Sequence, residues 1–93
     1  MDNYVDELNA RIEKLYDRIY QNKNMLVAYN LIEKEHSNYQ HIFMLPEIIN
    51  RNMQVGNYRR AALYSIFTER MMDEIESNSG RIREKINDYI LTD

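Results

Sequence analysis

Apolar residues recur at helical spacing along the first third of the chain. The residues that carry this pattern, in steps of three and four, are Val5, Leu8, Ile12, Leu15 and Ile19. Alternating steps of three and four are typical of a helix with a coiled-coil-like seam. The same register continues through a polar position, Asn22, to Leu26 and Tyr29. The pattern therefore predicts a helix over about residues 3–36, with Asn22 interrupting its apolar seam.

A second stripe of mainly apolar residues runs through the C-terminal third. Its members are Leu63, Phe67, Met71, Ile75, Asn78, Ile82, Ile86 and Tyr89. Because the stripe keeps its helical phase through residues 77–80, we favour one long helix over about residues 57–90. A bend or break at Gly80 stays open. In this interpretation Leu63 belongs to the core, and Arg59, four residues earlier, lies above the core stripe.

The segment between the two stripes is shorter and less regular. Residues 39–54 contain Pro46, which either opens a helix or kinks one, so we expect a short, Pro-containing connector helix there. Gly56 is suited to a turn, and Asn57 to the cap of the next helix. Two long segments of similar length with a short connector predict an antiparallel helical hairpin. The whole chain, residues 1–93, is expected to be one all-α domain.

Residues 25–32, with the sequence MLVAYNLI, are apolar nearly all round the predicted helix. The single seam of a helical hairpin cannot cover such a segment. We therefore expect a homo-oligomer, most simply a dimer, that completes a helical bundle. The residues expected at an oligomer or partner interface are apolar or aromatic: Met25, Leu26, Tyr29, Leu31, Ile32, Phe43, Ile66 and Met72.

The composition removes several kinds of chemistry. The chain has no cysteine, which excludes disulfides, thiolate catalysis and cysteine-based zinc sites. Glu33 and His36 have the Glu-x-x-His spacing of di-iron carboxylate bundles, but no second copy of that motif is present. Neither a serine nucleophile motif nor a glycine-rich phosphate loop occurs. We therefore expect a protein without catalytic residues, bound metal or cofactor, and not an enzyme.

Charge is distributed unevenly along the chain. The formal net charge is −3, yet residues 36–60 hold three basic residues and one acidic residue. Arginine and tyrosine gather there and in the following turn, so the candidate binding residues are Arg51, Tyr58, Arg59, Arg60 and Tyr64. This composition is typical of protein hot spots and of sites that stack on bases. No apolar run approaches a membrane span and the first residues do not resemble a secretory signal, so we expect a cytoplasmic protein with no membrane association.

Three functions follow from these features. The leading hypothesis is a small, acidic, helical interaction protein that occupies a specific protein partner as an inhibitor, antagonist or adaptor, of the kind that viruses and mobile elements encode. The alternative is an oligomer that binds a small anionic ligand, such as a nucleotide signal, through Tyr58, Arg59 and Arg60. The third is a helix-turn-helix DNA-binding regulator built from residues 46–53, a turn, and a helix that begins near Tyr58. The acidic remainder of the chain argues against nucleic acid as a partner.

Overall fold

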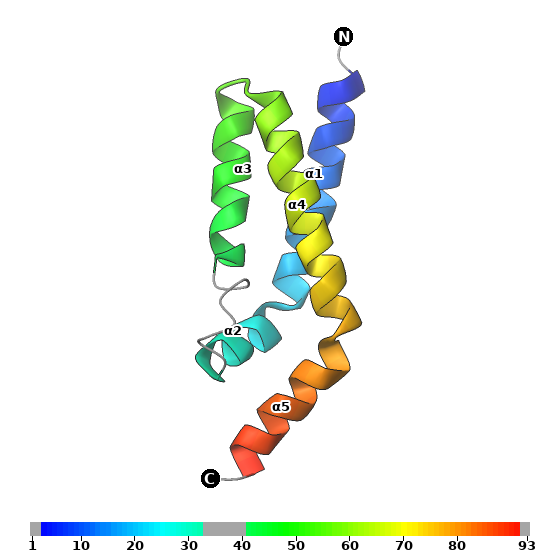
Figure 1. The fold of residues 1–93 in the computed structure, drawn as a ribbon. Helices are drawn as coiled ribbons and strands as arrows, with labels where there is room; N and C mark the ends of the chain where they lie inside the picture. The colour runs from blue at the N-terminus through cyan, green and yellow to red at the C-terminus, as the bar shows by residue number, and fades with distance from the viewer. Residues whose placement is uncertain (1–2, 33–40, 92–93) are drawn as a thin grey trace.

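Helices account for all the regular structure in the part of the chain that the computed structural model describes, residues 3–32 and 41–91. The elements, shown in Figure 1, are α1 (Asn3–Gln21), α2 (Lys23–Ile32), a short 3-10 turn η2 (Ile42–Met44), α3 (Leu45–Gln54), α4 (Tyr58–Ser77) and α5 (Ser79–Leu91). The predicted all-α class is confirmed. The expected end of the first helix at residue 36 and the start of the connector at residue 39 lie outside the described residues.

The two long segments run in the same direction. Arg11 pairs with Glu69 and Arg18 pairs with Glu76, and both pairs are 58 residues apart in sequence. A constant separation along the contact means that α1 and α4 are parallel, as Figure 1 shows. The expected antiparallel pairing is found instead between α3 and α4. The reason is that the connector forms a helix of its own, which carries the chain back toward the start of α1 before α4 begins.

The turn between α3 and α4 closes with the hydrogen bonds of a Schellman motif. Gly56 has a φ of +82°, a left-handed conformation that glycine adopts without steric cost. Its N–H donates to the carbonyl of Met53 at 3.2 Å, and the N–H of Asn57 donates to the carbonyl of Asn52 at 2.8 Å. The predicted turn at Gly56 is confirmed. Asn57 precedes α4, but its side chain makes no capping hydrogen bond.

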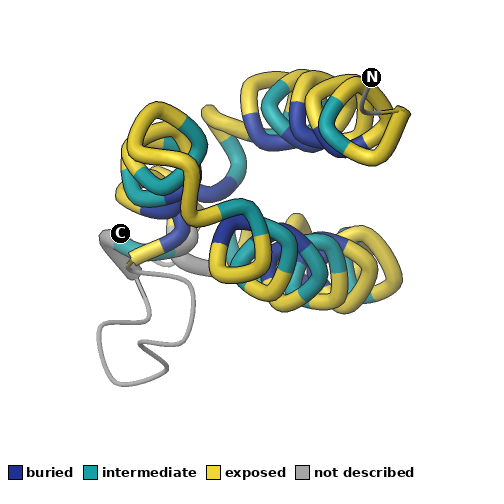
Figure 2. Tube along the Cα trace, turned by 90° about the horizontal axis from the view of Figure 1, so that it is seen from above, coloured by how far each residue is buried: buried dark blue, intermediate teal, exposed yellow. Residues whose placement is uncertain are grey.

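The α1 seam is the one that the spacing predicts. Its buried residues are Leu8, Ile12, Leu15 and Ile19, and the buried Leu26 continues the line in α2. The α4 seam is different, since its buried residues are Ala61, Ser65, Thr68, Met72 and Ile75. Leu63 and Phe67 are 60% and 57% exposed, so their prediction as core residues is wrong. Figure 2 shows how the buried positions turn inward among the helices.

The first half of the predicted C-terminal stripe does not lie in the core because its residues follow one another in repeated steps of four. Four residues of an α-helix turn by about 400°, so successive steps of four drift by about 40° around the helix. From Leu63 to Ile75 the stripe takes three such steps and winds from the exposed side to the buried side. Steps of four and three, as from Ala61 through Ser65 and Thr68, remain on one side.

Serine and threonine are buried in α4 because their hydroxyl groups are paired within the helix. Ser65 Oγ donates to the carbonyl of Ala61 at 2.7 Å, and Thr68 Oγ1 donates to the carbonyl of Tyr64 at 2.6 Å. Within the described residues, no buried side-chain nitrogen or oxygen lacks a hydrogen-bond partner. The buried side of α4 is therefore lined in its first half by small side chains, whereas that of α1 is lined by leucine and isoleucine.

Both long segments are interrupted at an asparagine. Asn22 separates α1 from α2, and Asn78 separates α4 from α5. Each side-chain amide donates to the carbonyl four residues earlier, Asn22 to Arg18 at 2.8 Å and Asn78 to Glu74 at 2.9 Å. Such bonds compete with the helical hydrogen-bond pattern. The second break falls at Asn78, while Gly80 lies inside α5. Beyond the two breaks α2 packs against α5.

Candidate interaction surfaces

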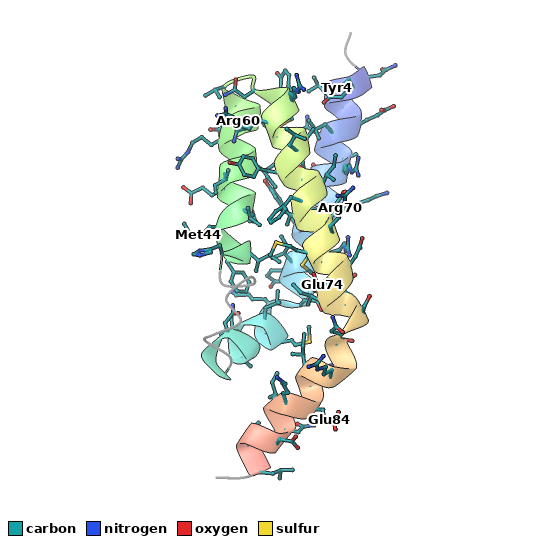
Figure 3. All side chains as sticks on the ribbon, viewed as in Figure 1. Tyr4, Met44, Arg60, Arg70, Glu74 and Glu84 are labelled. Carbon is teal, nitrogen blue, oxygen red and sulfur yellow. The ribbon has the colours of Figure 1, made fainter. Side chains whose placement is uncertain are left out.

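The exposed side of α4 carries a continuous row of residues that we call the α4 face. Its members are Arg60, Leu63, Phe67, Arg70 and Glu74, all of them exposed. They repeat in steps of three and four, which places them along one side of the helix. Leu63 and Phe67 lie in the middle of this row and, with Arg60 and Tyr64, line a shallow hollow. Arg60, Arg70 and Glu74 are labelled on α4 in Figure 3.

The charges on the α4 face are unpaired, unlike those along the contact with α1. Arg18 donates to Glu76 at 2.6 Å and to Asp73 at 2.7 Å, and these hydrogen bonds raise the pKa of Arg18 above its ordinary value against the opposing effect of burial. By contrast, no described residue forms an ion pair or hydrogen bond with the side chain of Arg60, Arg70 or Glu74. The α4 face therefore presents charges that are free to meet another molecule.

The predicted binding residues are brought together only in part. Tyr58, Arg59 and Arg60 line one hollow at the start of α4, beside the turn at Gly56. Tyr58 and Tyr64 are half-buried against the core. Arg51 lies on α3 and pairs instead with Glu47 at 3.1 Å. Arg59 is exposed, and because Leu63 is not a core residue, the expectation that Arg59 lies above the core stripe is wrong.

A second surface, which we call the aromatic hollow, lies where the end of α1 and the start of α2 meet η2 and α3. Its lining consists of Tyr16, Ile19, Tyr20, Lys23, Phe43 and Pro46, and it shares no residue with the α4 face. The hydroxyl of Tyr16 donates to the carbonyl of Pro46 at 2.8 Å, which ties α1 to α3. Burial raises the pKa of Tyr16. Tyr20 is 75% exposed at this hollow.

The sequence predicts Phe43 at an interface but does not single out Tyr20. The available signal was the spacing of Tyr16 and Tyr20, four residues apart and off the α1 seam, which places two aromatic side chains on one side of the helix. What the spacing could not indicate is that η2 brings Phe43 and Pro46 to the same place.

The residues expected at an oligomer or partner interface differ in how far they are buried. Leu26 and Met72 are 0% exposed inside the core of this chain, so their assignment to an interface is corrected. Met25 is half-buried against the core, and Ile66 is half-buried in a groove between α1 and α4. Phe43 lines the aromatic hollow. The side chains of the other three, Tyr29, Leu31 and Ile32, lie outside what the structure describes.

The arrangement of α3 and α4 does not match that of a helix-turn-helix motif. The DNA-binding motif crosses its two helices at about 90–120°. Here α3 and α4 lie side by side and antiparallel, as a tight helical hairpin (Figure 1). The turn at Gly56 thus joins two packed helices and does not project the second one as a separate recognition helix.

The described residues offer neither a metal-binding cluster nor a membrane-spanning helix. They contain no group of three or more histidine, aspartate or glutamate side chains placed to hold a metal ion, and Glu33 and His36 lie outside them. None of the described helices combines the length and apolar character needed to cross a membrane. Comparison of the chain with family models, curated proteins and solved structures finds no match.

Proposed function

We propose that this chain is a non-enzymatic interaction protein that binds a protein partner at the aromatic hollow and acts by occupying it, as an inhibitor, antagonist or adaptor. The observation that carries the proposal is the exposure of Tyr20 beside Phe43 and Pro46, on a hollow with Lys23 as its charged residue. Tyrosine and other aromatic residues dominate the energy of protein interfaces, because they bury a large area with few rotatable bonds. Pairing of Tyr16 with Pro46 holds one wall of the hollow in place before a partner arrives.

Site-specific photo-crosslinking tests this proposal. A benzoylphenylalanine replaces Tyr20 in cells that produce the protein, and the matched control carries it at Tyr4, an exposed tyrosine outside the hollow. We expect a discrete crosslinked product from position 20 that the position 4 control does not form. Adding Phe43→Ser should abolish this product. No product, or the same products from both positions, would contradict binding at the hollow.

A small anionic ligand is the second candidate, because the structure places Tyr58, Arg59 and Arg60 around one hollow. Arginine and the N–H groups of a helix start both favour phosphate oxygens. Calorimetric titration with ATP and with inorganic pyrophosphate tests it. We expect binding that weakens at high salt and with Arg59→Ala; no heat of binding at millimolar ligand would remove this candidate.

A further inference from the structure

We propose that the α4 face is a self-association site, at which two copies of this chain pair antiparallel across a two-fold axis at Phe67. The face joins exposed apolar side chains to charges without partners among the described residues, and it shares no residue with the aromatic hollow. This inference is therefore independent of the proposed partner site. The order of charges along the helix favours a second copy of this chain as the partner.

The spacing of the charged residues is symmetric about Phe67. Arg60 precedes Phe67 by seven residues and Glu74 follows it by seven. Seven residues are about two helical turns, or about 10.5 Å, so all three lie on one side of α4. A two-fold axis across the helix at Phe67 therefore places Arg60 of each copy opposite Glu74 of the other. In such an isologous interface the same pair forms twice.

The apolar residues fit the same axis. Phe67 of one copy meets Phe67 of the other, where offset or edge-to-face contact of the two rings is favourable. Leu63 lies four residues before Phe67 and Arg70 three after it, on the same flank of the helix. Pairing thus places Leu63 against the methylene groups of Arg70 from the second copy, while the guanidinium stays in water. Both exposed apolar residues of the face become covered.

The order of charges also distinguishes the second copy from an unrelated acidic helix. The face begins with a basic residue, Arg60, and ends with an acidic residue, Glu74. A partner helix that is acidic throughout would complement Arg60 but meet Glu74 with like charge. A second copy in antiparallel orientation complements both ends.

Sedimentation equilibrium across micromolar concentrations tests the proposal, with the reversals Arg60→Glu and Glu74→Arg. We expect the wild-type mass to rise from 11.3 kDa toward twice that value. Each single reversal turns two attractive pairs into two repulsive ones and should raise the dimer Kd by about tenfold or more. The double variant exchanges the charges, restores attraction, and should return the Kd to within about threefold of wild type.

Controls separate this interface from other causes of association. Arg83→Glu changes the same charge on α5, away from the α4 face, and should leave the dimer Kd unchanged. Phe67→Ser removes the central contact and should leave a monomer with unchanged helical circular dichroism. A wild-type protein that stays at 11.3 kDa overturns the proposal. So does a dimer whose Kd responds no more to Arg60→Glu than to Arg83→Glu, or one that the double variant does not restore.

Discussion

Helices α1 and α4 lie side by side but differ in where their large apolar residues lie. In α1 the large apolar residues are buried in the seam, and the exposed positions are mainly polar or charged. In α4 the seam contains alanine, serine and threonine in its first half, while Leu63 and Phe67 are exposed. A helix that only stabilises the fold has no need of large apolar side chains in water. The contrast indicates that α1 contributes large aliphatic side chains to the core, whereas the first half of α4 contributes small ones and exposes its aliphatic and aromatic residues on the other side.

Truncating one leucine in each helix tests this contrast most strongly. Leu15→Ala removes a fully buried side chain from the α1 seam and should lower the free energy of unfolding by about 2–5 kcal/mol. Leu63→Ala removes an exposed side chain and should change the unfolding free energy of the monomer by about 0.5 kcal/mol or less. Urea unfolding followed by circular dichroism, at concentrations that keep the chain monomeric, measures both. Equal losses would show that Leu63 is a core residue after all.

Enlarging a small residue of the α4 seam should have the next largest effect on the free energy of unfolding. Ser65 is 0% exposed, so Ser65→Leu must force a larger side chain into the contact with the neighbouring helices. Overpacking of this kind costs about 1–3 kcal/mol. Ser65→Ala is the matched control, since it keeps the seam narrow and loses only the bond to the Ala61 carbonyl. A leucine variant as stable as wild type would mean that the seam does not need small residues.

The same contrast explains which parts of the fold could be predicted from the sequence. Large apolar residues at steps of three and four identify the α1 seam directly. Ala61, Ser65 and Thr68 form an equally regular seam, but a search for apolar residues passes over serine and threonine, whose burial depends on hydroxyl bonds to the helix backbone. The apolar residues that remained, Leu63 and Phe67, then indicated the wrong side of the helix.

Other features depend on contacts that sequence spacing does not contain. The parallel direction of α1 and α4 follows from the length of α3, which residue periodicity leaves open. The break lies at Asn78, whose side chain bonds the Glu74 carbonyl, whereas the sequence offers Gly80 as the place for a bend or break. At the candidate surfaces, the gathering of Arg59 and Arg60 with Tyr58 is predicted from composition, whereas the exposure of Arg59 is not. The aromatic hollow is not predicted either, because it requires η2 to bring Phe43 to Tyr20.

The two sides of α4 also differ in whether their charges are paired, and this difference should have the smallest effect on stability. Arg18 pairs with Asp73 and Glu76, and its side chain is only 28% exposed. Arg18→Met keeps an unbranched side chain against the helix and removes the charge, so it should cost about 0.5–1 kcal/mol, because partly exposed ion pairs are screened by water. Arg70→Met is the matched control on the α4 face, and in the monomer it should cost less, because no described acidic residue pairs with Arg70.

Salt separates the two variants further. Ions screen partly exposed charges over about 10 Å at 0.1 M, so the stability difference between wild type and Arg18→Met should shrink as sodium chloride rises toward 1 M. The Arg70→Met difference should stay near zero at every salt concentration when the chain is monomeric. Urea unfolding at several salt concentrations provides this comparison. If both variants showed the same salt dependence, Arg18 at the α1–α4 contact and Arg70 on the α4 face would be equivalent. The α4 face would then lose its distinction as the side with free charge.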